Sequence, residues 1–224
     1  MHLLLCDVKE ANIDCPKLSR FLFEGAVPRV ALFNSSGSLV ATLTILKGTT
    51  AWWFSQFQRL LSFFNHCKTL EIVCDSYKEL VFPEEVRESC IPPMPDLQHL
   101  EINFRSSTVD YAELLDNLLW LSPHLKMVSL TSKFEKQRLK FQYKKISQEK
   151  DEEILFNCCK AYPRECWRHC LERVMLDNID GSADEDDGQI SLFSFFYENA
   201  KGLVSIQDNS GTYEWREVDT EGVL

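Results

Sequence analysis

One short phrase decides the fold of this chain, and its clearest copy reads Pro95-Asp96-Leu97-Gln98-His99-Leu100-Glu101-Ile102. In each copy an anchor, most often leucine, is followed three and usually five positions later by apolar residues. The other copies are Cys15-Pro16-Lys17-Leu18-Ser19-Arg20-Phe21-Leu22-Phe23, Cys67-Lys68-Thr69-Leu70-Glu71-Ile72, Pro123-His124-Leu125-Lys126-Met127-Val128-Ser129-Leu130, Cys170-Leu171-Glu172-Arg173-Val174-Met175-Leu176 and Gly202-Leu203-Val204-Ser205-Ile206. Repeats of this kind indicate an array of similar units.

The spacing within the phrase predicts a short strand. Two apolar residues two positions apart, such as Leu100 and Ile102, point to the same face of a strand. The anchor, here Leu97, turns the chain into the strand and fills the space beneath it. From Cys67 onward the anchors recur at intervals of about 30 residues, near the leucine-rich period, except for a longer interval between Leu125 and Leu171 that must contain an insertion.

Helical patterns lie between the phrases. Thr49 or Thr50 can cap a helix whose apolar stripe is Trp53, Phe57, Leu60, Leu61 and Phe64. Asp110 can cap a second helix with Leu114, Leu115, Leu118 and Leu119 on one side. A third passes through Leu192, Phe193, Phe196, Tyr197 and Ala200 and stops near Gly202.

Strand, helix and parallel strand form the unit of an α/β solenoid. We therefore predict an α/β fold, an irregular leucine-rich-repeat solenoid with parallel strands on the concave face and helices outside. The repeat domain spans residues 1–207, with a basic, irregular insertion at 131–165 and the last repeats at 166–207. Residues 208–224 form a loose tail or add a terminal edge strand.

Two segments fit the repeat poorly. Residues 26–46 alternate weakly and predict one or two strands with a turn at Asn34-Ser35-Ser36-Gly37. In the insertion, Leu139, Phe141 and Tyr143 alternate with Arg138, Lys140, Gln142 and Lys144, which predicts a half-buried strand whose lysines would guard a sheet edge.

Composition restricts the class of protein. The net charge of −10 argues against a nucleic-acid partner. No apolar stretch has the length of a membrane helix, and the opening Met1-His2-Leu3-Leu4-Leu5-Cys6 is too short for a signal-peptide core. We expect no membrane partner and a cytoplasmic or nuclear location, where the 9 cysteines would be reduced and mostly buried.

Four longer motifs resemble plant F-box/leucine-rich-repeat proteins. They are Glu10-Ala11-Asn12-Ile13-Asp14-Cys15-Pro16-Lys17-Leu18, Leu119-Trp120-Leu121-Ser122-Pro123-His124-Leu125-Lys126, Cys166-Trp167-Arg168-His169-Cys170-Leu171-Glu172-Arg173-Val174 and Phe195-Phe196-Tyr197-Glu198-Asn199-Ala200-Lys201-Gly202-Leu203. The last two are similar to that family's C-terminal FBD region, so 166–207 would be FBD-like. The resemblance implies the substrate-recognition part of a Skp–cullin–F-box ubiquitin ligase, in which the repeats hold the target.

The chain departs from that family in two ways. The N-terminal F-box that docks on the Skp adaptor has no counterpart here, so we expect adaptor binding only if an F-box exists upstream. The asparagine that ends the common repeat motif is replaced by Asp75, Arg105, Lys133 and Ile179. Without that asparagine, other groups must hydrogen-bond the repeat backbone.

No motif points to catalysis or to a cofactor. Cys158, Cys159, Cys166, His169 and Cys170 could bind zinc, but two close ligand pairs are missing, and structural packing is the favoured interpretation. No glycine-rich phosphate loop or nucleophile motif is present. We nominate no catalytic residue, no metal site and no cofactor.

The residues that alternate with the buried strand positions are the candidate binding site. They are Glu71, Val73, Glu101, Asn103, Ser129, Thr131, Met175 and Asp177, expected on the concave face. This mixture of acids, small polar residues and apolar residues suits a target protein or peptide better than an anionic ligand. The alternatives are a plain solvated sheet with binding through the convex side or loops, a truncated gene product, a general interaction scaffold, and an unrecognised enzyme.

Overall fold

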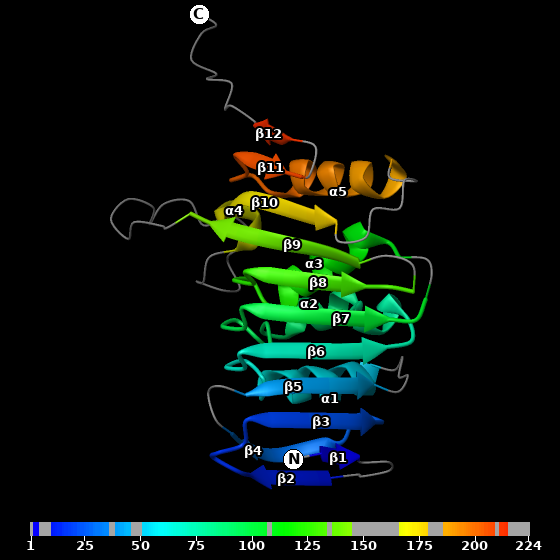
Figure 1. Ribbon diagram of the computed structural model, residues 1–224. Coiled ribbons are helices and arrows are strands. Elements are labelled where there is room, and N and C mark those ends of the chain that lie inside the picture. The colour runs from blue at the N-terminus through cyan, green and yellow to red at the C-terminus, as the bar shows by residue number, and fades with distance from the viewer. Residues whose placement is uncertain are drawn as a thin grey trace, which may run out of the picture.

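Figure 1 shows the computed structural model, in which strands stack side by side along the length of the molecule and helices α1, α2 and α3 lie behind them. The structure describes residues 2–4, 10–35, 39–45, 51–106, 109–133, 136–144, 166–178, 186–208 and 211–214. The helices are α1 (Ala51–Ser62), α2 (Glu84–Ser89), α3 (Tyr111–Leu121), α4 (Trp167–Cys170) and α5 (Asp186–Asn199), with a 3-10 turn η1 (Tyr77–Leu80).

One ten-stranded sheet runs through most of the described chain. Its order is β1 (His2–Leu4), β3 (Arg20–Gly25), β5 (Val40–Ile45), β6 (Thr69–Cys74), β7 (His99–Phe104), β8 (Met127–Thr131), β9 (Lys136–Tyr143), β10 (Leu171–Asn178), β11 (Ser205–Gln207) and β12 (Thr212–Glu214). The pairs from β1 to β8 are all parallel, as is the β10–β11 pair. The protein is therefore a mixed α/β molecule with a mostly parallel sheet.

The phrase strands align in register, as the sequence predicts. Leu70 pairs with Leu100 and Leu100 with Val128, while Ile72 pairs with Ile102 and Ile102 with Leu130. All of these side chains are buried, as are the phrase residues Phe21, Phe23, Val174 and Leu176. The prediction that the phrases form neighbouring strands with one buried face is confirmed for the strands from β6 to β8.

Residues 26–46 contain two strands, within the one or two that the sequence predicts, but only β5 joins the main sheet, where it lies between β3 and β6. The other strand, β4 (Arg29–Asn34), pairs in parallel with β2 (Glu10–Asp14), which the sequence did not indicate, in a separate two-stranded sheet.

The basic strand of the insertion is not at an edge. β9 is antiparallel to both of its neighbours, β8 and β10, and lies inside the sheet between them. Its lysines therefore cannot protect a sheet edge, and they stand instead on the face that the helices leave open. The antiparallel insertion restores β10 to the direction of β8, so the repeat strands stay parallel to each other.

The core lies between the sheet and the helix layer. On α3, Leu114, Leu115, Leu118 and Leu119 are fully buried, and the predicted cap is present because Asp110 accepts a hydrogen bond from the Glu113 backbone N–H at 3.0 Å. Phe141 of β9 contacts Phe196 of α5, with ring centroids 6.1 Å apart. This contact places α5 on the same side of the sheet as the core.

The predicted helix stripes are partly correct. Trp53, Phe57, Leu60 and Leu61 of α1 are buried, while Phe64 is buried in the turn that follows the helix. Thr49 and Thr50 lie outside the described residues. Leu192 and Phe196 of α5, and Ala200 just after it, are buried as predicted, but Tyr197 is 63% exposed and Phe195 is buried in its place.

Aromatic packing joins the small sheet to the rest of the core. Phe33 of β4 contacts Phe21 of the main sheet edge-on at 5.2 Å, and it contacts Phe64 after α1 at 5.0 Å. Strand β4 therefore covers the same sheet face that the helices cover farther along the chain. Near the N-terminus the sheet is therefore covered by a strand, whereas farther along the chain it is covered by helices.

At the ends of β6 and β7, backbone and side-chain groups form hydrogen bonds in place of the missing asparagine. The backbone N–H groups of Arg105 and Ser106 donate to the carbonyls of Cys74 and Asp75, at 3.3 and 3.0 Å. The Arg105 side chain also reaches Asp75, with Nη1 3.1 Å from Oδ1. At the far end, β12 adds an antiparallel edge strand to β11, which is the second of the two outcomes considered for residues after 207.

Candidate binding surface

The eight predicted binding residues lie on one face of the main sheet, the face opposite the helices. Residues one position before or after a buried strand residue point away from the core, and all eight occupy such positions. We call this surface the open face. Besides these eight residues it contains Thr42 and Thr44 of β5, His99 of β7, Met127 of β8, Lys136, Arg138 and Lys140 of β9 and Arg173 of β10.

Cross-strand pairing brings six of the eight residues together. Glu71 pairs with Glu101 and Glu101 with Ser129, forming one row across β6, β7 and β8. Val73 pairs with Asn103 and Asn103 with Thr131, forming the next row. Met175 and Asp177 are on the same face, but β9 separates their strand from this group.

Glu71 is held in place by its neighbours. Thr42 Oγ1 donates to one carboxylate oxygen at 2.9 Å, and Asn103 Nδ2 donates to the other at 2.6 Å. A carboxylate that accepts two hydrogen bonds from adjacent strands stabilises the face and offers less to a partner. Glu101, in contrast, has no hydrogen bond or ion pair with any residue that the structure describes, and it is half-buried.

Ser129 is less accessible than the sequence suggested. It is only 7% exposed, because it lies between the longer side chains of Glu101 and Arg138, its register partners on the adjacent strands. A partner on the open face would meet those side chains first. Ser129 forms the floor of the surface rather than a contact on it.

A row of cations on β9 is the part of the surface that the sequence analysis missed. Lys136, Arg138 and Lys140 all stand on the open face, opposite Thr131, Ser129 and Met127 of β8 respectively. Their alternation with Leu139 and Phe141 was visible in the sequence. The strand was assigned to an edge because lysines on an edge strand and lysines on an open face give the same pattern.

The β9 cations outnumber the carboxylates within reach. Lys140 Nζ lies 2.7 Å from Asp177 Oδ2, with side chains 42% and 39% exposed. Arg138 pairs in register with Asp177 but makes no hydrogen bond or ion pair with the described residues, and its Nε is buried without an acceptor. Lys136 is also unpaired within that part of the chain. Two of the three cations therefore have no carboxylate partner within the described part of the chain.

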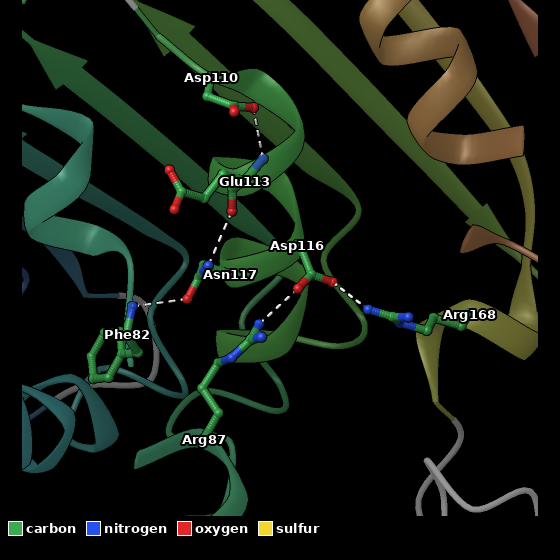
Figure 2. A network of polar contacts seen from close by, with 7 residues as sticks. All are labelled: Phe82, Arg87, Asp110, Glu113, Asp116, Asn117 and Arg168. Atoms are coloured by element: carbon green, nitrogen blue, oxygen red, sulfur yellow. Dashed lines mark hydrogen bonds and ion pairs between the residues drawn. The ribbon is translucent and has the colours of Figure 1, made fainter. Parts of the chain in front are cut away.

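A second polar cluster lies on the helix side and has a structural role. The carboxylate of Asp116 on α3 forms two ion pairs, one from Oδ2 to Arg87 Nη1 of α2 and one from Oδ1 to Arg168 Nη2 of α4, each at 2.7 Å (Figure 2). Next to it, Asn117 accepts a hydrogen bond from the Phe82 backbone N–H and donates to the Glu113 carbonyl (Figure 2). Both oxygens of Asp116 are occupied, so the cluster connects helices and leaves no group for a ligand.

The group of cysteines and a histidine that was weighed as a zinc site, with structural packing favoured, lies only partly among the described residues. Cys158 and Cys159 lie outside the described residues. Cys166 and Cys170 lie on one helical turn, since the Cys170 backbone N–H donates to the Cys166 carbonyl at 3.2 Å. Burial, followed by the charges of Lys201 and Arg168, lowers the pKa of His169. Among the described residues no three His, Cys, Asp or Glu side chains converge as a metal site would require.

The comparisons with known proteins assign no identity. The chain matches no protein-family model, no curated protein and no solved structure. Among the helices of the described chain, none combines the length and the apolar character that crossing a membrane takes. The features of the molecule that bear on function are therefore the geometry and the charge of the open face.

Proposed function

We propose that this chain is a protein-binding module whose open face holds a target protein or peptide. The observation that carries the proposal is the difference between the two sides of the sheet. One side is covered by helices and β4, whereas the other presents partly exposed, chemically mixed side chains along the strands from β5 to β10. Sheets in α/β proteins with parallel strands are ordinarily covered on both faces, so a sheet with one uncovered face offers a broad surface for a partner.

We also propose that the sheet and helices form an irregular leucine-rich-repeat solenoid. The in-register phrases support a leucine-rich-type repeat array, in which the open face would be the concave side and the helices the convex side. In such an array each repeat contributes two or three side chains to a continuous surface. Glu101, Asn103 and Thr131 are adjacent contributions of this kind from two repeats.

The resemblance to plant F-box/leucine-rich-repeat proteins suggests the biological setting. In that setting the chain would recognise the target of a Skp–cullin–F-box ubiquitin ligase, in the cytoplasm or nucleus. The resemblance covers the repeats and not the adaptor-docking module. We therefore assign target binding to this chain, and we expect the Skp adaptor to be recovered only through an F-box upstream.

Affinity purification from plant cells tests the proposal with matched variants. The open-face variant is Val73→Glu/Asn103→Glu/Thr131→Glu, and the control is Ser55→Glu/Ser62→Glu/Ser89→Glu on exposed positions of α1 and α2. Both variants change the net charge equally. We expect proteins captured by the native chain and the control to be lost from the open-face variant, with folding of both variants verified by circular dichroism. Retention of every captured protein by the folded open-face variant would reject the open face as the binding site.

A further inference from the structure

The charges on the open face are sorted by strand. Its described acids on β6 and β7 are Glu71 and Glu101, β8 presents only Met127, Ser129 and Thr131, and β9 presents three cations. Adjacent strands lie about 4.8 Å apart, so the acidic and basic rows are separated by about 10 Å or more. Each row is therefore a distinct electrostatic feature, not one neutralised network.

The basic row is unusual for this molecule. The chain carries a net charge of −10, yet Lys136, Arg138 and Lys140 stand together with Arg173 of β10 close by. Asp177, the described acid beside this row, is bound by Lys140. A half-buried arginine normally has a carboxylate or another acceptor, because an unsatisfied buried donor costs free energy. Arg138 Nε has none among the residues that the structure describes, so an external acceptor would complete this part of the surface.

We propose that the β9 row binds an extended acidic segment of the partner, with carboxylates at every second residue. This inference rests on the proposed function of the open face. The three cations are two residues apart along one strand, which spaces them about 6.8 Å apart on a single line. A partner segment in extended conformation presents alternate side chains at the same spacing. Two carboxylates could then face Lys136 and Arg138 in register, and a third would meet Lys140 beside Asp177.

The surface suits an acidic peptide better than a nucleic acid. None of the described open-face positions is Phe, Tyr or Trp, so no side chain offers the stacking platform that single-stranded nucleic acids use. Glu101 lies two strands from Arg138 and would repel a phosphate backbone that extended across the sheet. Beside the row, β8 presents the uncharged Met127, Ser129 and Thr131, which would not repel an acidic peptide.

Synthetic peptides test this inference by fluorescence anisotropy at low ionic strength. The probes are a peptide with Glu alternating with Thr, a peptide of the same composition with its Glu residues in one block, a peptide with Lys alternating with Thr, and an oligothymidylate. The proteins are the native chain, Lys136→Gln/Arg138→Gln/Lys140→Gln, and the control Lys17→Gln/Arg59→Gln/Lys78→Gln, which removes three exposed cations elsewhere. Circular dichroism and thermal melting establish that each variant is folded.

We expect the native chain and the control to bind the alternating acidic peptide about tenfold more tightly than the β9 variant does, chiefly from the two surface charge pairs made by Lys136 and Arg138. Binding should weaken as salt is added. Equal affinity for the block peptide would overturn the match of spacing, and tighter binding of the oligonucleotide would overturn the choice of partner. Equal affinity for all probes, or undiminished binding by the folded β9 variant, would overturn the inference entirely.

The peptide-binding test and the affinity-purification test can fail independently of each other. If the Val73/Asn103/Thr131 variant loses its cellular partners while the acidic peptide fails to bind, the open face is the binding site but the partner chemistry is wrong. If that folded variant keeps all partners, the proposed function fails whatever the peptides do. An acidic peptide that binds through β9 in that case would define a peptide site on the β9 part of the open face that the cellular partners do not use.

Discussion

Replacing Leu100 by alanine tests the strand register from which the open face is defined. Leu100 is 1% exposed and lies at the centre of the buried row, between Leu70 and Val128. Truncation removes three carbon atoms from the core, worth about 2.4 kcal/mol of transfer free energy at about 0.8 kcal/mol for each. The cavity that remains raises the expected total to about 3–4 kcal/mol.

The neighbouring Glu101→Ala is the matched control. Glu101 is adjacent in sequence but stands on the other face, and it makes no hydrogen bond or ion pair with the described residues. We expect Glu101→Ala to change the free energy of unfolding by less than about 0.5 kcal/mol. Urea unfolding followed by tryptophan fluorescence and circular dichroism measures both variants. Equal costs, or a cost below about 0.5 kcal/mol for Leu100→Ala, would refute the register.

Three further predictions concern the rest of the molecule. Asp116→Asn should destabilise the chain by about 1–3 kcal/mol in urea unfolding, because it leaves two partly buried arginines without their carboxylate; an unchanged midpoint would contradict the structural role of the cluster. Gly202→Ala should lower the free energy of unfolding by about 1–3 kcal/mol, because the added Cβ would lie 2.5 Å from the carbonyl oxygen of His169. Gly211→Ala, with open space around the added Cβ, should leave stability unchanged. Equal melting temperatures for the two variants would show that the close approach at Gly202 is wrong. Burial raises the pKa of the Cys67 thiol to about 12, so at pH 9 about one molecule in 1,000 carries the thiolate. Iodoacetamide should therefore modify the half-buried Cys90 far faster than Cys67 in the folded chain, and both cysteines equally fast in urea. Comparable rates in the folded chain, measured by peptide mass spectrometry, would contradict the burial of Cys67.

The local pattern of the sequence predicted the regular strands well. Leu100 and Ile102 alternate with polar residues and follow a buried anchor, Leu97, so strand, face and entry turn all follow from neighbouring residues. The Asp110 cap was predicted for the same reason, since its partner is the Glu113 backbone N–H three residues later. Interactions between residues only a few positions apart can be predicted from a short stretch of sequence.

Features that depend on distant segments were missed. β5 has the small Ala41 where β6 and β7 have Leu70 and Leu100, so its strand was predicted from the sequence but its place between β3 and β6 was not. The pairing of β2 with β4 depends on a parallel alignment between segments about 20 residues apart. The alternation on β9 specified a one-sided strand but not its neighbours, and its place between β8 and β10 is set by the return of the chain from beyond residue 165.

The candidate site was affected in the same way. The eight predicted residues were placed on one face by the period of two along each strand, which is a local property. The cations that define the chemistry of that face come from β9, which the sequence analysis had assigned to an edge. A charge pattern alone does not distinguish solvent at the edge of a sheet from solvent on its face.

Site-specific photo-crosslinking tests the central claim most directly. A benzophenone amino acid is introduced at Glu101 on the open face of β7, and separately at the exposed Glu88 of α2 on the helix side. Each protein is expressed in plant cells, irradiated and purified under denaturing conditions. Binding on the open face should give a discrete cross-linked target from position 101 and none from position 88. A target cross-linked from position 88 alone, or equally from both positions, would contradict the assignment of binding to the open face.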